Sequence, residues 1–272
     1  MQILLKGTIV ADKIIQRLKD FSPKRTLGIV RVGSYPGSSS YLKGIKKTAS
    51  KAEISLELLE LEKNAPEEEI KNSVREMKES GKVDGILLME PLPTWAPIQE
   101  LIEIVGKDLD VEGIHPYNLG KTLLGASEII ISTPKAVLEL MDFYKIKPEG
   151  KNTVILGRSN VVGKPLANLL LRKGQFGNAT VTVCHSRTKD LKKITKKADI
   201  LIVSIGKPQF VTEEFIKEGA IVIDVGINEK EGRITGDVDF ESVKDKSYAV
   251  TPVPGGVGSI TTAALLSNLY QL

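Results

Sequence analysis

The chain has 272 residues, of which 41% are hydrophobic and 26% charged, the composition of an ordinary globular protein. Lys and Arg number 38 against 34 Asp and Glu, a formal net charge of +4, and only 5% of the residues are aromatic. Because the basic residues are scattered and form no stripe with interleaved aromatics, a nucleic-acid partner is not expected.

Cysteine content and hydropathy narrow the class further. Cys184 is the only cysteine, which excludes an intramolecular disulfide and a metal site built from several cysteines. No apolar run reaches the roughly 20 residues of a membrane span, and charged residues closely follow the short apolar run at the N-terminus, unlike a signal peptide. We therefore expect a cytoplasmic protein that has no membrane partner and binds no metal.

In the first half of the chain, apolar runs of strand length alternate with amphipathic stretches of helix length. Strands are predicted at 27–33, 54–61 and 83–89, with a helix from 38 to 51 between the first two. A second helix should begin at Pro-Glu-Glu-Glu, since acidic residues favour a helix N-terminus. This alternation predicts a parallel sheet with helices on both faces.

The alternation restarts at Asn152 with four further strand candidates, the pattern of a doubly wound nucleotide-binding domain. Helices are predicted at about 134–144 and near the C-terminus. The fold class is therefore α/β, with two lobes flanking a cleft and a Rossmann-like doubly wound parallel sheet in the second lobe. We assign residues 1–132 to the first domain, with 258–272 packing back on it, and 133–257 to the second.

A glycine-rich turn follows the strand candidate that begins at Asn152. Gly157 and Gly163 bracket it, and a helical pattern comes next, so backbone N–H groups could approach a pyrophosphate there. The usual G-x-G-x-x-G pattern would need glycine at Ser159 and Val162 as well. The spacing alone is as compatible with a plain strand–helix turn as with dinucleotide binding.

The end of the following strand bears on the choice of cofactor. An NAD site commonly has an Asp or Glu there to hold the ribose hydroxyls. Here the chain reads Cys184-His185-Ser186-Arg187-Thr188. Hydroxyls and a cation, together with Arg158 in the glycine turn, suit the extra 2′-phosphate of NADP. The alternative is a solvated loop that happens to be basic.

Longer motifs carry a family resemblance over essentially the whole chain. The motifs are VGSYPGSSSYLKGIKK, DVEGIHPYNLGK, STPKAV, VILGRSNVVGKPLANLLL, ATVTVCHSRT, GAIVIDVGIN and TPVPGGVG, in that order. By these motifs the chain resembles the bifunctional methylenetetrahydrofolate dehydrogenase/methenyltetrahydrofolate cyclohydrolase family. The resemblance implies a homodimer formed through the cofactor lobe, with NADP on the second lobe and a tetrahydrofolate derivative in the cleft. It also implies hydride transfer to NADP, followed in bifunctional members by hydration of the methenyl product.

The resemblance also implies roles for individual residues. Cofactor contacts would come from Gly157, Arg158, Ser159, Ser186, Arg187 and Ile227. Folate contacts would come from Tyr41, Met89, Pro91, Leu92, Glu112, Pro254, Gly255 and Gly256. The candidate catalytic residues are Tyr41, Glu112 and Lys46.

The chain departs from the family motifs where the hydration step would take place. In the family's Tyr-x-x-x-Lys motif, Ile45 occupies the lysine position, and Lys46 lies about 100° further round the helix. Met89 replaces the glutamine that partners that lysine, and Glu112 replaces an aspartate that contacts folate. We expect the longer Glu112 still to reach the pterin ring, and interpret Glu90 as a solvent-facing loop residue.

These departures predict a dehydrogenase whose cyclohydrolase activity is weak or lost. Three alternatives remain open. A rearranged helix that brings in Lys46 would keep the enzyme fully bifunctional. A relative that only binds folate or nucleotide would have lost catalysis altogether. A shikimate-type dehydrogenase would need a Lys/Asp pair in the cleft, and no such pair can be placed in this sequence.

Overall fold

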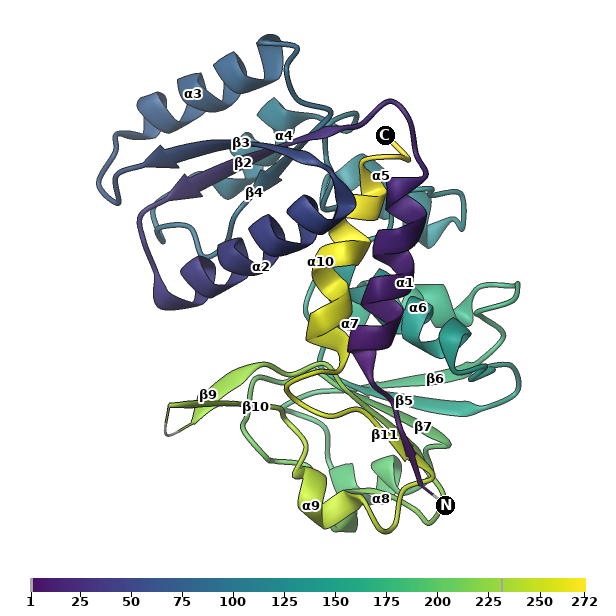
Figure 1. Cartoon of the computed structure of the whole chain (residues 1–272). Helices are drawn as coiled ribbons and strands as arrows, with labels where there is room; N and C mark the ends of the chain where they lie inside the picture. The colour runs from purple at the N-terminus through teal and green to yellow at the C-terminus, as the bar shows by residue number, and fades with distance from the viewer. Residues whose placement is uncertain (1, 231) are drawn as a thin grey trace. The chain divides into compact units, whose positions relative to one another are not determined.

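The structure, a computed structural model, describes residues 2–230 and 232–272. The chain divides into two compact units (Figure 1). Unit 1 comprises Met1–Asp12 and Thr133–Thr261, and unit 2 comprises Lys13–Ser132 and Thr262–Leu272. Among the described residues, no helix combines the length and the apolar character needed to cross a membrane.

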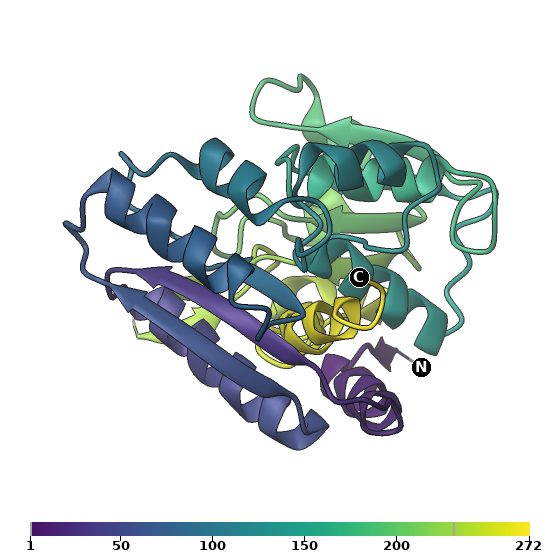
Figure 2. The same ribbon diagram turned by 90° about the horizontal axis from the view of Figure 1, so that it is seen from above.

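Unit 2 contains a three-stranded parallel sheet of order β3-β2-β4. The central strand β2 (Thr26–Val32) pairs with β3 (Ser55–Leu61) on one side and β4 (Gly85–Leu88) on the other. Helix α2 (Pro36–Ala52) covers one face of the sheet, and α3 (Glu67–Glu79) and α4 (Ile98–Val105) cover the other (Figures 1 and 2). The predicted strand–helix alternation of this half is therefore confirmed.

The amphipathic pattern of α3 explains its position. Glu67, Glu68 and Glu69 occupy its first turn, where carboxylates interact favourably with the helix dipole. Ile70, Val74 and Met77 recur at helical spacing and are buried. They pack with apolar side chains of β2, β4 and α4 in one core.

The remaining parts of unit 2 include α5 (Pro116–Leu123) and the C-terminal part of α10 (Val257–Asn268). Asn268 is fully buried, and its amide donates hydrogen bonds to the carbonyls of Val111 at 2.8 Å and Ile130 at 2.9 Å. These bonds satisfy buried carbonyls and hold the end of α10 against the loop that contains Glu112.

Unit 1 is built on a six-stranded sheet of order β1-β11-β8-β7-β5-β6, in which every pair is parallel. The strands are β1 (Ile3–Leu4), β5 (Asn152–Leu156), β6 (Thr180–Cys184), β7 (Ile200–Val203), β8 (Ile221–Asp224) and β11 (Ala249–Val250). The chain runs outward from β5 to β6 and then returns to β7 on the other side of β5. This reversal is the topological switch point of a doubly wound sheet and confirms the predicted fold class.

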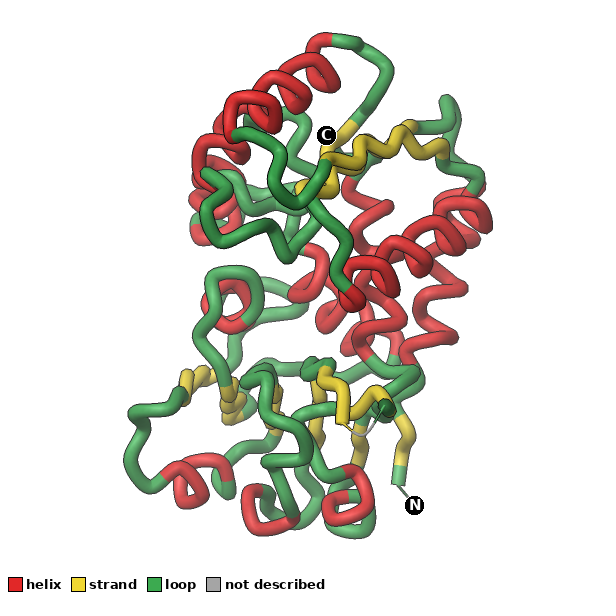
Figure 3. Tube along the Cα trace, turned by 90° about the vertical axis from the view of Figure 1, so that its left-hand side faces the viewer, coloured by secondary structure: helices red, strands yellow, loops and turns green. Residues whose placement is uncertain are grey.

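Further helices of unit 1 join these strands. Figure 3, with helices in red and strands in yellow, shows both types of element in each unit. The helices that join the strands of unit 1 are α7 (Gly163–Leu171), α8 (Leu191–Thr195), η1 (Glu213–Phe215) and α9 (Phe240–Val243). The unit boundaries along the chain, at residues 12/13, 132/133 and 261/262, fall inside α1 (Gly7–Lys19), α6 (Ser132–Phe143) and α10.

Two features of unit 1 differ from the sequence expectation. β1 pairs with β11, so residues 1–12 belong to unit 1 rather than to the unit formed by most of residues 1–132. A strand of two residues is too short to leave a hydropathy pattern. An antiparallel pair, β9 (Asn228–Lys230) and β10 (Arg233–Thr235), follows β8 and was also not anticipated.

Candidate functional site

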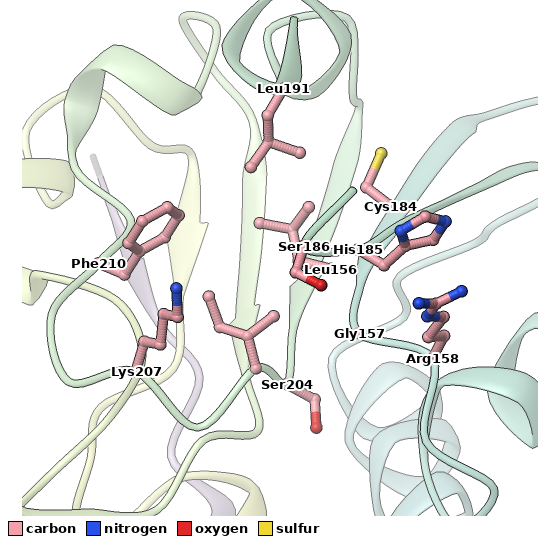
Figure 4. A pocket seen from close by; sticks show the side chains of 11 residues that line it. Leu156, Gly157, Arg158, Cys184, His185, Ser186, Leu191, Ser204, Lys207 and Phe210 are labelled. Carbon is pink, nitrogen blue, oxygen red and sulfur yellow. The ribbon is translucent and has the colours of Figure 1, made fainter. Parts of the chain in front are cut away.

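A pocket lies at the carboxyl ends of β5, β6 and β7 in unit 1 (Figure 4). The carboxyl edge at a switch point is the usual ligand-binding position in open parallel sheets. Its lining residues are Leu156, Gly157, Arg158, Cys184, His185, Ser186, Leu191, Ser204, Ile205, Lys207 and Phe210.

Close backbone packing explains the two glycines that bracket the turn after β5. A Cβ on Gly157, whose φ is 125°, would lie 2.1 Å from the carbonyl oxygen of Ser204. A Cβ on Gly163 would lie 2.2 Å from the carbonyl oxygen of Gly157. Ser159 stands where the common pattern has glycine, and its Oγ accepts a hydrogen bond from the Val162 N–H at 3.1 Å. The turn therefore leads tightly from β5 into α7 without a middle glycine.

The end of β6 forms the adjoining wall. The Gly157 N–H donates to the Cys184 carbonyl at 2.9 Å, which joins this strand end to the glycine turn. The His185 N–H donates to Thr188 Oγ1 at 2.9 Å, and the Arg187 N–H donates to His185 Nδ1 at 3.1 Å. In Figure 4 Arg158 and His185 lie on one side of the pocket, and Lys207 and Phe210 on the other.

The structure brings only some of the predicted cofactor residues together. Gly157, Arg158 and Ser186 line the pocket, whereas Ser159 and Arg187 lie next to lining residues. Ile227 follows β8, is 65% exposed and does not line this pocket. Among the residues that the structure describes, no Asp or Glu is part of the lining. The pocket thus combines two cations, hydroxyls and apolar side chains.

Sequence reasoning missed the wall that contains Ser204, Lys207 and Phe210. This segment directly follows β7, the neighbour of β5 in the sheet. The rule that ligands bind at the carboxyl ends of parallel strands could have indicated it. Identifying β7 as the neighbour of β5, however, requires the strand order.

A second group of candidate residues lies in unit 2, centred on Glu112. Ser132 Oγ donates a hydrogen bond of 2.5 Å to Glu112 Oε1. Burial raises the pKa of Glu112 from its ordinary value of 4.5 to about 7; the Ser132 hydrogen bond opposes this, and the nearby carboxylates of Asp110 and Glu90 add to it. Burial, with a smaller contribution from the Glu112 charge, also raises the pKa of Tyr41 on α2. Tyr41 and Glu112 therefore share one environment.

The loop that carries Glu112 is fixed by the preceding aspartate. The buried Asp110 carboxylate accepts hydrogen bonds from the N–H groups of Gly113 at 3.0 Å, Ile114 at 3.2 Å and His115 at 2.8 Å. It also accepts one from Asn118 Nδ2 at 2.8 Å. Four donors on one carboxylate hold the loop in a single conformation.

Ile45 and Met89, which replace the lysine and glutamine of the family motifs, are buried, whereas Lys46 is exposed. Ile45 is 0% exposed and Met89 is 1% exposed, so both lie in the core of unit 2. Lys46 is exposed, and α2 continues without interruption from Pro36 to Ala52. The helix therefore undergoes no change of register that would turn Lys46 to the face of Tyr41 and Ile45. Glu90 is exposed, as expected.

The other predicted folate residues are divided between the two units. In unit 2, Pro91 is exposed, and Leu92 is partly buried against the core of α3 and α4. In unit 1, the Gly255 carbonyl accepts a hydrogen bond from the Gly7 N–H at 2.8 Å, Gly256 is buried and Pro254 is exposed. A Cβ on Gly256 would lie 2.4 Å from the carbonyl oxygen of Pro252, so this tight turn requires glycine.

Two family models match the chain. One is described as tetrahydrofolate dehydrogenase/cyclohydrolase, catalytic domain, and matches residues 5–112. The other is described as the NAD(P)-binding domain of the same family and matches residues 131–272. Together they cover both halves of the chain.

Individual proteins are similar over the same length. The bifunctional protein FolD of Dictyoglomus turgidum is 44% identical, over 100% of this chain and 98% of that protein. The crystal structure of the bifunctional FolD of Campylobacter jejuni has a TM-score of 0.94 and 38% identity, covering 100% of this chain and 98% of that one.

A second similar structure is that of Trypanosoma brucei N5,N10-methylenetetrahydrofolate dehydrogenase-cyclohydrolase, complexed with NADP and an inhibitor. It has a TM-score of 0.92 and 29% identity, covering 99% of this chain and 96% of that one. The order of motifs, the doubly wound sheet and the full-length similarity agree, and this chain belongs to the tetrahydrofolate dehydrogenase/cyclohydrolase family.

Proposed function

We propose that this chain is an NADP-dependent methylenetetrahydrofolate dehydrogenase whose cyclohydrolase activity is weak or lost. The observation that carries the second part is the burial of Ile45 and Met89, at 0% and 1% exposure, at the two positions where the family motifs have lysine and glutamine. The first part rests on family membership and on the chemistry of the unit 1 pocket.

The donor set of the unit 1 pocket supports NADP as the cofactor. Arg158 and Ser186 line the pocket close to the glycine turn, and Lys207 lies on the opposite wall. A guanidinium and a hydroxyl suit a 2′-phosphate, whereas the carboxylate that an NAD site commonly uses is not among the lining residues described. The Trypanosoma brucei relative, which was solved with NADP, also supports this choice.

The dehydrogenase step requires little acid–base chemistry from the protein. Bound NADP would supply the hydride acceptor for the methylene carbon of the folate, with NADPH and the methenyl compound as the products. The residues of this chain bind and orient the reactants, because hydride transfer depends mainly on geometry. We assign Tyr41 and Glu112 to the folate, Glu112 as the acceptor for N–H donors of the pterin ring.

Hydration of the methenyl product, unlike hydride transfer, requires acid–base groups from the protein. Water must be activated and protons must be moved, which is general acid–base work. Ile45 and Met89 have no group that can hold or transfer a proton, and Lys46 is on an exposed face of α2. This chemistry supports a dehydrogenase that releases the methenyl product for a separate hydrolytic reaction.

We also propose that the protein is a homodimer formed through unit 1. Strand β6 is at one edge of the six-stranded sheet, and Thr180, Thr182 and Val183 on it are exposed. An edge strand with unpaired backbone groups is a template for a second copy, so the partner would meet β6.

The proposal is tested by incubating the protein with methylenetetrahydrofolate and NADP while NADPH, methenyl and formyl products are followed separately. NADPH and methenyl should accumulate in equal amounts, with formyl forming no faster than without enzyme. Enzyme-dependent formyl production would support the fully bifunctional alternative. NADP binding without any NADPH formation would support a relative that only binds nucleotide.

A double variant tests whether Ile45 and Met89 are the reason that cyclohydrolase activity is weak or lost. With Ile45→Lys combined with Met89→Gln, formyl should form at least about tenfold faster than it does without enzyme, since a positioned general acid–base group contributes about 100-fold or more. Lys46→Ala is the matched control, and its product ratio should equal that of wild type. If formyl production depends on Lys46, the argument from Ile45 is wrong.

A further inference from the structure

The segment after β7 forms one wall of the unit 1 pocket. Ser204, Ile205 and Lys207 all line the pocket, and no helix follows β7 directly. Consecutive N–H groups in such a segment have no helical partners and need acceptors from elsewhere in the fold. The identity of that acceptor decides how firmly this wall is held.

The acceptor is the carboxylate of Asp237, which is 0% exposed. Its Oδ2 accepts hydrogen bonds from the N–H groups of Ile205 at 2.6 Å and Gly206 at 3.0 Å. Its Oδ1 accepts one from the Lys207 N–H at 2.7 Å and one from Asn228 Nδ2 at 2.9 Å. Each oxygen of the buried carboxylate thus has two donors, and three of the four are backbone groups of the pocket wall.

A second buried carboxylate holds Asp237 itself in place. Asp224, at the end of β8, is 2% exposed, and it accepts hydrogen bonds from the N–H groups of Asp237 at 3.1 Å and Val238 at 2.9 Å. The Asp237 carbonyl in turn accepts one from the Val211 N–H at 3.0 Å. The aspartate is therefore fixed through its backbone on both sides while its side chain reaches the wall.

Two glycines leave room for these carboxylates. A Cβ on Gly226 would lie 2.3 Å from the carboxyl carbon of Asp237, and a Cβ on Gly236 would lie 1.9 Å from Asp224 Oδ2. Any other residue at either position would push a carboxylate out of place. The Asp-Val-Gly and Thr-Gly-Asp sequences that contain them are thus shaped around the two buried acids.

We propose that Asp237 is a positioning residue for NADP, acting through the wall segment 205–207. The carboxylate sets the path of this backbone, and the path sets where Lys207 enters the pocket opposite Arg158 (Figure 4). The inference rests on the proposed occupation of this pocket by NADP. Asp237 itself is not among the lining residues, so its effect on the cofactor is indirect.

Asp237→Asn is the sharpest test because it conserves size. An amide has one oxygen, so in either orientation two of the four donors face an NH₂ group instead of an acceptor. The dissociation constant for NADP, measured by calorimetry, should rise at least about tenfold. The KM for NADP should rise in parallel, while the KM for methylenetetrahydrofolate and kcat stay within about twofold.

Asp239→Asn is the matched control from the same segment. Its carboxylate accepts a hydrogen bond from the Ser242 N–H at 3.2 Å and caps the short helix α9. This variant should bind NADP within about twofold of wild type. A merely structural role for Asp237 would lower the thermal midpoint without the selective loss of NADP affinity.

The outcomes separate the inference from the proposed function. Wild-type protein that fails to bind NADP would overturn the proposed function, and the inference with it. Wild type that binds NADP, together with an Asp237→Asn variant of equal affinity, would overturn the inference alone. If Asp237→Asn shows no cooperative unfolding, the Asn228→Ala variant serves as the test instead. It removes one hydrogen-bond donor to Asp237 Oδ1 and should weaken NADP binding about threefold. An unchanged affinity for NADP would contradict the inference.

Discussion

Glu112, which we propose to contact the folate, has an unusual proton affinity. Its carboxyl group accepts a hydrogen bond from Ser132, and its pKa is raised to about 7, mainly because burial disfavours the charged form. The same residue is one carbon longer than the aspartate of the family motif. A carboxyl group whose pKa is near 7 can be either neutral or charged under physiological conditions, so Glu112 would link the proposed folate site of unit 2 to pH.

The raised pKa predicts a specific pH dependence of stability. The folded state holds the Glu112 proton more tightly than the unfolded chain, where the pKa is near 4.5. The resulting stabilisation is fully present below pH 4.5 and is lost as pH rises through about 7. Glu112→Gln keeps an acceptor for Ser132 but cannot ionise, so above pH 7.5 it should be more stable than wild type by on the order of 2 kcal/mol.

Thermal unfolding of both proteins between pH 4 and pH 8.5 checks this prediction. The difference in unfolding free energy should grow in favour of Glu112→Gln across the window from about 4.5 to 7. Glu57→Gln, at an exposed position on β3, serves as control and should follow the wild-type profile. A constant difference between Glu112→Gln and wild type at all pH values would show that Glu112 has an ordinary pKa.

At the scale of single elements, the start of α2 matters because it carries Tyr41. Arg31 on β2 is 8% exposed, and its side chain contacts residues at the start of this helix. Its guanidinium donates to Ser34 Oγ at 2.9 Å and Ser39 Oγ at 2.5 Å, and pairs with Glu60 Oε1 at 2.9 Å. One planar side chain thus ties the loop before α2 and its first turn to the sheet.

Replacing Arg31 should therefore loosen the start of α2. Arg31→Met should lower the unfolding free energy by on the order of 2 kcal/mol, because two serine hydroxyls lose a charged donor. It should also raise the KM for methylenetetrahydrofolate several-fold through Tyr41. Arg31→Lys should have an intermediate effect, since an ammonium lacks the planar fork.

Glu60→Gln is the control for this prediction. Glu60 is half-exposed, with 56% of its side chain accessible, so weakening this surface ion pair should cost at most about 0.5 kcal/mol. Denaturant unfolding and steady-state kinetics measure the two effects. An Arg31→Met variant with wild-type KM would show that the hydrogen bonds to Ser34 and Ser39 do not position Tyr41.

At the scale of the whole molecule, the proposed homodimer makes a prediction about the edge of the unit 1 sheet. Light scattering should give twice the chain mass of 29.6 kDa. Val183→Lys on β6 should give a monomer, because a charged side chain on an edge strand prevents edge-to-edge pairing. Ile3→Lys on β1, at the opposite edge, should remain a dimer. A monomeric wild type, or a dimeric Val183→Lys variant, would contradict assembly through β6.

Much of the fold could be predicted from local patterns. The strand predicted at 27–33 is β2 (Thr26–Val32), and the helix predicted at 38–51 is α2 (Pro36–Ala52). Both are long, and their apolar residues repeat at a clear period, so the signal is strong. The glycine turn at Gly157–Gly163 was located in the same way, since the pattern on both sides changes from strand to helix.

The candidate sites were predictable only where one motif contains them. Gly157, Arg158 and Ser186 were found because they lie on the first strand–turn–helix unit of the second half and on the next strand end. Lys207 and Phe210 were missed because β7 becomes a neighbour of β5 only through the strand order. The Asp224–Asp237 arrangement was missed for a similar reason, since residues 13 positions apart are joined there by backbone hydrogen bonds.

The sequence by itself determined the α/β class, the alternation of strands and helices, the family and the replacement of lysine and glutamine by Ile45 and Met89. These properties follow from residue identity and from periods of a few residues. The tertiary structure alone decided the pairing of β1 with β11, the exposure of Lys46, the raised pKa of Glu112 and the wall held by Asp237. Each of these depends on burial or on contacts between segments far apart in the chain, which local sequence patterns do not encode.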